Sequence, residues 1–84
     1  MSKKAKPTYY VSVTIRGNYF PLQQELKQRF GETVGGGYCF FNGERDLEWE
    51  RKTEFGAEQL QNMIKTVAGR FHKRVRVEIG SSID

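Results

Sequence analysis

The sequence has few of the residues that build disulfides, metal sites and catalytic dyads. Cysteine and histidine each occur once in 84 residues, as Cys39 and His72. A single cysteine excludes an internal disulfide and a multi-cysteine metal site, so packed apolar side chains must hold the fold together. Cys39 and His72 are predicted on different elements, too far apart to act as a nucleophile and its base. We therefore expect no catalytic residue, no metal, no cofactor and no enzymatic activity.

Long hydrophobic runs are also missing. No apolar stretch approaches the ~20 residues that a helix needs to cross a bilayer, so we expect no membrane association. The first residues, MSKKAKPTYY, are positively charged, but Pro7 and Thr8 stand where the apolar part of a signal peptide would begin. Because one unpaired cysteine is typical of a reducing compartment, the predicted location is the cytoplasm.

The net charge of +4 depends on the first few residues. Lys3, Lys4 and Lys6 lie in residues 1–7, which we expect to form a disordered basic tail. In the remainder, residues 44–58 carry six acids and three bases, whereas residues 65–76 carry five bases and no acid. The folded part should therefore be strongly dipolar, which affects association and the choice of partner.

Two segments alternate as half-buried strands do. In residues 9–17, YYVSVTIRG, one face carries Tyr9, Val11, Val13 and Ile15 and the other carries Tyr10, Ser12, Thr14 and Arg16. Residues 74–80, RVRVEIG, alternate valine and isoleucine with Arg74, Arg76 and Glu78 in the same way. Each segment is predicted to bury its apolar face and to leave the other face polar.

The remaining segments predict two helices and a hairpin. Residues 18–31 repeat Leu22, Leu26 and Phe30 at helical spacing, and Gly31 suits the end of that helix. Asn42-Gly43 favours a tight turn between two strands within residues 36–52. A longer helix is predicted over residues 53–71, with Thr53 as its cap. The apolar stripe of this helix consists of Ala57, Leu60, Met63, Ile64, Val67 and Phe71.

The predicted order of elements is βαββαβ within one α+β domain, residues 8–80, followed by a flexible C-terminus, residues 81–84. This order resembles the ferredoxin-like split βαβ architecture, which implies a four-stranded antiparallel sheet of order 4-1-3-2 with two helices packed on one face. Because unrelated functions share that architecture, it does not by itself predict what the protein does.

The hairpin decides which face of the sheet is buried. Glu48 and Glu50 cannot be buried unpaired, so Leu47 and Trp49 must face the helices, together with Tyr38 and Phe40 across the turn. The open face should then combine basic side chains, hydroxyls and acids, with the hydroxyls separating a basic column from an acidic one. A base-stacking platform is disfavoured, because it needs exposed rings on the central strands. The open face is predicted to carry Arg74, Arg76, Glu78, Ser12, Thr14, Asp46, Glu48 and Glu50, with Cys39 and Phe41 at its edge.

These features favour a non-enzymatic binding module, such as a regulatory, inhibitory or accessory protein, that docks on a protein partner. The dipolar surface supports a protein partner, because complementary charges steer association and reject wrong partners. Gly35, Gly36 and Gly37 could also admit the backbone of a partner strand at the sheet edge. The predicted partner-binding residues are Phe41, Asp46, Glu48, Glu50, Arg74 and Arg76.

Nucleic-acid binding is the alternative hypothesis. A basic corner formed by Lys65, Arg70, His72 and Lys73 could contact phosphates together with the N-terminal lysines. Local structure also accounts for these charges, since cations are favoured near a helix C-terminus and arginines alternate with valines in a strand. The sequence predicts neither the identity of the partner nor the oligomeric state.

Overall fold

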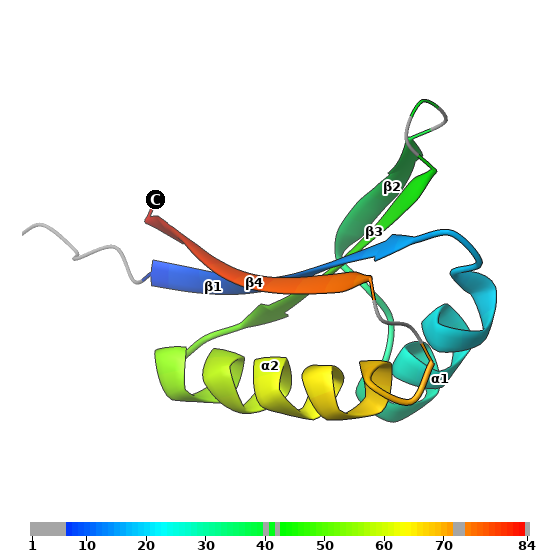
Figure 1. Ribbon diagram of the computed structural model, residues 1–84. Coiled ribbons are helices and arrows are strands. Elements are labelled where there is room, and N and C mark those ends of the chain that lie inside the picture. Colours follow the sequence, from blue (N-terminus) through cyan, green and yellow to red (C-terminus); the bar gives the residue numbers. More distant parts are fainter. Residues whose placement is uncertain (1–6, 40, 42, 72–73, 84) are drawn as a thin grey trace, which may run out of the picture.

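The computed structural model describes residues 7–39, 41, 43–71 and 74–83. All six expected elements are present, in the predicted order (Figure 1). They are β1 (Pro7–Arg16), α1 (Phe20–Phe30), β2 (Gly35–Cys39), β3 (Glu44–Arg51), α2 (Glu54–Ala68) and β4 (Val75–Ile83).

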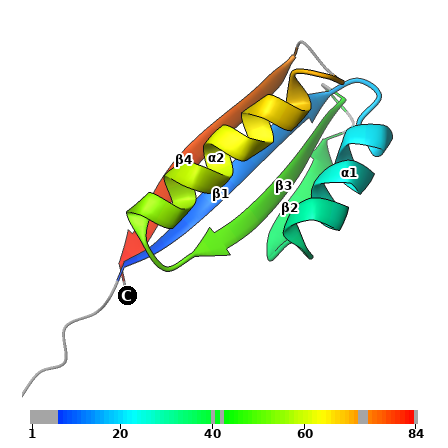
Figure 2. The same ribbon diagram turned by 90° about the horizontal axis from the view of Figure 1, so that it is seen from below.

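The four strands form one antiparallel sheet in the order β2-β3-β1-β4. This is the predicted order 4-1-3-2 read from the opposite edge, so the α+β class and the strand order are confirmed. Both helices lie on the same side of the sheet (Figure 1). Seen from that side, α2 runs along β4 and β1, while α1 lies beside β2 and β3 (Figure 2). The other face of the sheet has no helix over it.

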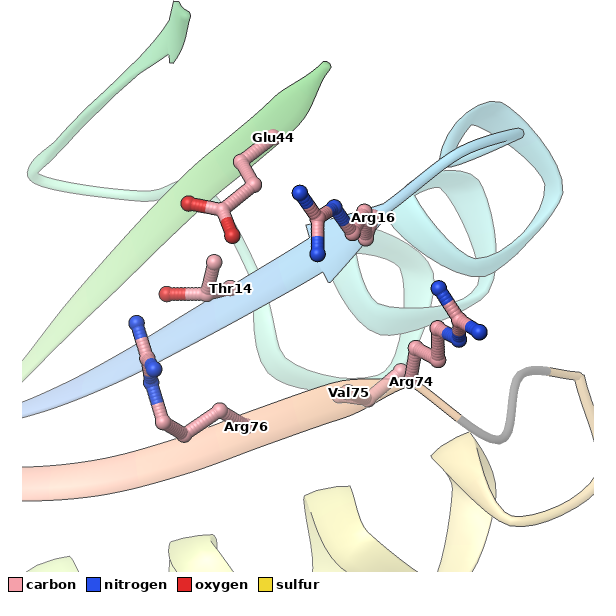
Figure 3. A pocket seen from close by; sticks show the side chains of 6 residues that line it. All are labelled: Thr14, Arg16, Glu44, Arg74, Val75 and Arg76. Carbon is pink, nitrogen blue, oxygen red and sulfur yellow. The ribbon is translucent and has the colours of Figure 1, made fainter. Parts of the chain in front are cut away.

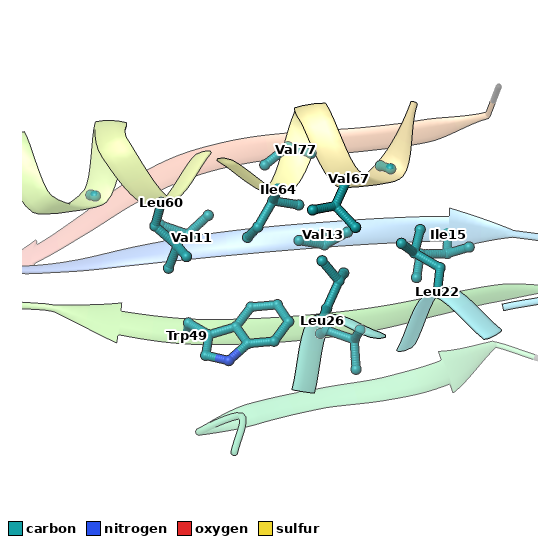
Figure 4. Packing of buried hydrophobic residues seen from close by; sticks show 13 residues of the cluster. Val11, Val13, Ile15, Leu22, Leu26, Trp49, Leu60, Ile64, Val67 and Val77 are labelled. Carbon is teal, nitrogen blue, oxygen red and sulfur yellow. The ribbon is translucent and has the colours of Figure 1, made fainter. Parts of the chain in front are cut away.

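The core forms between the helices and the inward faces of the three strands β1, β3 and β4 (Figure 4). Alternation puts every second residue of β1 inward, which buries Val11, Val13 and Ile15 completely. Trp49 is the largest buried side chain, with 1% of its surface exposed. Leu47 of β3 is also completely buried, and the helices contribute four large buried side chains, Leu22, Leu26, Leu60 and Ile64.

The expectation that the hairpin turns its large side chains toward the helices holds for β3. Leu47 and Trp49 are buried as predicted. Tyr38 lies on the same face of the sheet as Leu47 and Trp49, because it pairs with Arg45 of β3. However, 45% of its surface is exposed. This part of the hairpin curves away from the helix layer (Figure 1), and the Tyr38 ring packs against the ring of Tyr19, with centroids 5.6 Å apart. Phe40 lies outside the described residues.

The two outer boundaries of the folded region differ from those expected. β1 begins at Pro7, one residue inside the predicted tail, and β4 continues to Ile83. Pro7 pairs with Ile83, Thr8 with Ser82 and Tyr9 with Ser81. Residues 81–83, expected to be flexible, are therefore held in the sheet because the first residues of β1 offer them a partner strand. Residues 1–6 and Asp84 lie outside the described residues.

The longer helix has the predicted cap but a shorter extent. Thr53 precedes α2, and its side-chain oxygen accepts a hydrogen bond from the Gly56 N–H at 3.0 Å. The helix ends at Ala68, so Phe71, the last member of the predicted apolar stripe, lies in the following turn and is 43% exposed. Met63 is also partly exposed, because it lies at the side of α2 rather than above the sheet.

Candidate functional site

Charged and hydroxyl side chains line the face of the sheet that is turned away from the helices. The strand register arranges them in rows that run across β4, β1 and β3. From one end of the sheet to the other, the rows are Arg74, Arg16 and Glu44; Arg76, Thr14 and Asp46; Glu78, Ser12 and Glu48; and Gly80, Tyr10 and Glu50.

The first two rows enclose a hollow of about 340 Å³, which we call the arginine hollow. The guanidinium groups of Arg16, Arg74 and Arg76 surround it, beside the Glu44 carboxylate and the Thr14 side chain (Figure 3). Val75 completes the lining. Arginine presents its N–H groups in a planar fork that matches two oxygens of a carboxylate, so this hollow suits acidic groups of a partner.

A second hollow, of about 330 Å³, adjoins the first and shares Thr14 with it. We call it the acidic hollow, because three carboxylates line it. Thr14 donates a hydrogen bond to Asp46 at 3.0 Å, and Ser12 donates one to Glu48 at 3.3 Å. The hydroxyls of β1 therefore hold the carboxylates of β3 against the sheet. The lining residues are Ser12, Thr14, Gly36, Asp46, Leu47, Glu48 and Glu78.

Two of the three glycines of β2, Gly35 and Gly36, are required by the acidic hollow and by the sheet itself. A Cβ atom on Gly35 would lie 2.9 Å from Oε1 of Glu48, so this glycine leaves room for the carboxylate above β2. Gly36 has φ of +136°, and a Cβ atom there would lie 2.2 Å from the backbone oxygen of Asp46. We expected these glycines to let the backbone of a partner approach closely. At Gly36 the backbone that approaches is that of β3 in the same chain.

In addition to the predicted separation of a basic column from an acidic one by the hydroxyls of β1, charge varies along the strands of this face. Glu78 follows Arg76 on β4, so the outer strand carries both signs, and Glu44 stands next to Arg16 at the basic end. The antiparallel register sets Glu78 beside Ser12 and Glu48 in one row. The result is a gradient from the arginine hollow, at the end of β1, to the acidic hollow in the middle of the sheet.

Phe41 stands at the same end of the sheet as the arginine hollow. It lies in the four-residue connection, residues 40–43, between β2 and β3, and its side chain is fully exposed. The Gly17 N–H donates a hydrogen bond to the Gly43 oxygen at 3.2 Å, which ties this turn to the end of β1. An exposed aromatic residue thus lies in the turn that follows the end of the sheet where Arg16 pairs with Glu44.

Tyr10, like Arg16 and Glu44, lies on the open face but is absent from the residues predicted to line it. Alternation places it on this face, beside Ser12, and the register sets it between Gly80 of β4 and Glu50 of β3. Its ring is half-buried. The absence of a side chain at Gly80 was the signal that could have drawn attention to it, because a glycine leaves space beside a large ring.

Of the residues predicted to bind nucleic acid, only Lys65 and Arg70 are among the described residues. Lys3, Lys4, Lys6, His72 and Lys73 lie outside the described residues. Lys65 is exposed on α2. Arg70 lines a groove of about 220 Å³ between α1 and α2, and Lys65 is not in the lining of that groove. The other lining residues are Arg29, Phe30, Met63, Thr66 and Val67.

Among the described residues, no group of three or more His, Cys, Asp and Glu side chains could hold a metal ion. Neither α1 nor α2 has the length and apolar character of a membrane-spanning helix.

No protein-family model, no curated protein and no solved structure matches this chain. Function must therefore be inferred from the surface of the molecule itself.

Proposed function

We propose that the protein is a non-enzymatic binding module, of a regulatory, inhibitory or accessory kind, that docks on a protein partner through its open sheet face. The observation that carries this proposal is the pair of adjoining hollows that share Thr14, one lined by three arginines and the other by three carboxylates. The contact residues of this proposal are Phe41, Asp46, Glu48, Glu50, Arg74 and Arg76.

Such a surface favours a partner that carries the reverse arrangement of charge. An acidic group of the partner would enter the arginine hollow, and a basic group would lie over Asp46 and Glu48. Opposite charges in this arrangement accelerate association and fix orientation, while a partner with the wrong pattern meets like charges. Phe41 adds an aromatic contact next to the arginines, and aromatic residues and arginine are enriched in protein interfaces.

We further propose that the βαββαβ arrangement is of the ferredoxin-like split βαβ type and that the protein works in the cytoplasm. The strand order and the helices on one face support the first proposal. The single cysteine supports the second. Neither statement assigns a function, which rests on the charges of the open face.

The test is affinity capture of partners with the two ends of the face altered separately. One variant combines Glu48→Lys with Glu50→Lys, a second carries Arg74→Glu, and a third carries Phe41→Ser. Lys27→Glu in α1 is the matched control, because it changes charge on the helix side of the molecule. We expect a protein that the unaltered chain and the control both capture after nuclease treatment and that the face variants lose. Equal capture by all variants would contradict the proposed surface.

The nucleic-acid alternative has weaker support among the described residues. Arg70 and Arg29 line one groove together with the apolar side chains of Phe30, Met63 and Val67, and Lys65 is not part of that groove, so the described bases of the hypothesis do not form one stripe. The open face holds carboxylates in its middle, where they would repel a phosphate backbone. Binding through Lys65, Arg70, His72, Lys73 and the N-terminal lysines therefore stays a hypothesis for direct measurement.

A further inference from the structure

The outer edge of β4 has backbone groups that point away from the sheet. β4 is the last strand at one side, next to β1 (Figure 2). The Arg16 N–H donates to the Arg74 oxygen at 3.4 Å, so the even-numbered residues of β4 bond to β1. The N–H and C=O groups of Val75, Val77 and Ile79 therefore point outward. The Gln61 side chain confirms this, because it donates to the Val77 oxygen from outside the ladder, at 3.1 Å.

We propose that β4 pairs with β4 of a second copy of this chain, antiparallel about a two-fold axis at Val77. Such pairing sets Val77 opposite its own symmetry mate and Val75 opposite Ile79 of the second copy. Val75 and Ile79 present outward backbone groups, so this pair can exchange both N–H···O bonds. The Val77 oxygen has two lone pairs, so it can accept the N–H of the second copy's Val77 beside its bond from Gln61. The two sheets would join into one continuous antiparallel sheet, and the exposed edges of both β4 strands would be covered.

Charge complementarity selects this register. With the axis at Val77, Arg76 stands opposite Glu78 of the second copy, and Glu78 stands opposite Arg76. Moving the axis to residue 76 would place Arg76 opposite itself, and moving it to residue 78 would do the same for Glu78. Like charges directly opposite each other are unfavourable in a sheet. Arg76 and Glu78 already approach within 3.8 Å in one chain, so the dimer would hold four alternating charges.

The neighbouring positions also fit the same axis. Arg74 would face Gly80 of the second copy, where no side chain blocks the long arginine. On the helix side, Val75 and Ile79 are only partly buried in the single chain and would gain cover from each other. The contact of Gln61 with β4 shows which side of α2 faces the edge, and Glu58 and Lys65 flank Gln61 on that side and are exposed. The two-fold would bring Glu58 toward Lys65 of the second copy.

The first test swaps the charges of residues 76 and 78, which face each other across the two-fold axis. Sedimentation equilibrium of the full chain over a concentration series measures the oligomeric state. We expect a species of twice the 9.8 kDa chain mass. Arg76→Glu alone, or Glu78→Arg alone, would place like charges opposite each other twice in every dimer and raise the dissociation constant by about tenfold or more. The combined Arg76→Glu and Glu78→Arg variant would restore dimerisation, and Lys27→Glu would leave it unchanged. A monomer at all concentrations, or a combined variant no better than the single ones, would overturn the proposal.

Cross-linking tests the register independently of charge and of any loss of stability in the single variants. In a Cys39→Ser background, protein with Arg76→Cys is mixed with protein with Glu78→Cys and oxidised. Directly opposite positions in a non-hydrogen-bonded pair have Cα atoms about 4.5 Å apart, within the range that a disulfide spans. Intact-mass spectrometry should show the mixed dimer in excess over either homodimer. A statistical mixture, or an excess of the Arg76→Cys homodimer, would contradict an axis at Val77.

Discussion

The indole N–H of Trp49 donates a hydrogen bond to the backbone oxygen of Gly31, at 3.0 Å. This bond joins β3 to the residue that directly follows α1, and the Phe30 ring packs edge-on against the same indole. One side chain therefore fills the core, satisfies a carbonyl at a helix C-terminus and fixes which face of the hairpin is covered. The open face is a consequence of that placement, since the residues adjoining Trp49 on β3, Glu48 and Glu50, must point the other way.

Trp49→Phe should keep the fold and lower its stability. The variant keeps an aromatic ring but loses the hydrogen bond to Gly31 and part of the buried volume, so we expect a loss of about 1 to 3 kcal/mol in the free energy of unfolding. Urea denaturation followed by circular dichroism measures it. Phe55→Leu is the control, because Phe55 is 69% exposed and its replacement should change stability by less than about 0.5 kcal/mol. Equal effects of the two variants would contradict the role assigned to the indole.

Gly36→Ala and Gly37→Ala should differ sharply although the residues are adjacent. An alanine at position 36 would need φ near +136° and would bring its Cβ against the Asp46 oxygen, whereas a Cβ at position 37 meets nothing within 4 Å. We expect Gly36→Ala to cost more than about 1 kcal/mol and Gly37→Ala to be nearly neutral. Thermal unfolding of both variants makes the comparison, and a similar midpoint for the two would show that the close approach of β2 to β3 is not as described.

Thr53→Ala should weaken the start of α2. Removal of the side-chain oxygen leaves the Gly56 N–H without its capping acceptor, which costs about 1 kcal/mol in typical helices. Thr53→Ser keeps the oxygen and should retain most of the stability. Chemical denaturation distinguishes the two variants, and hydrogen exchange should show faster opening of the first turn of α2 in the alanine variant alone.

Nucleic-acid affinity should be weak and should depend on the N-terminal lysines. We expect generic DNA and RNA to bind only at low salt and deletion of residues 1–6 to abolish that binding, because the open face carries carboxylates in its middle. Fluorescence anisotropy at two salt concentrations measures both effects. If the deleted chain still binds near physiological salt, and if Lys65→Glu with Arg70→Glu removes that binding, the protein is a nucleic-acid-binding module instead.

Much of the fold could be predicted because each element carries a local signal. Val11 and Val13 alternate with polar residues, and Leu22 and Leu26 repeat at helical spacing. Trp49 and Glu50 are neighbours in a strand, so they point to opposite faces of the sheet. These signals agree on which face of the sheet is buried. The end of β4 could not be predicted, since Ser81 and Ser82 have no strand signal of their own. They are held by pairing with β1, which is a tertiary effect.

The sequence predicts which residues lie on the open face better than it predicts how they are arranged there. Alternation identified Arg74, Arg76, Asp46 and Glu48 as outward residues. The position of each row along the sheet depends on the register between strands, which sequence periodicity does not determine beyond its parity. For this reason the two hollows around Thr14, and the Glu48 carboxylate above Gly35, became visible only in three dimensions.

The pairing of Pro7 with Ile83 has a practical consequence for handling the molecule. Pro7 and Ile83 lie side by side at one end of the sheet, beyond the row where Tyr9 faces Arg51. The connection that carries Phe41 follows the opposite end, where Arg16 faces Glu44. A dye attached at Thr8 or Ser82 is therefore held away from the arginine hollow. The same proximity permits a circular permutant, with a short linker joining the old ends and new ones opened within residues 40–43.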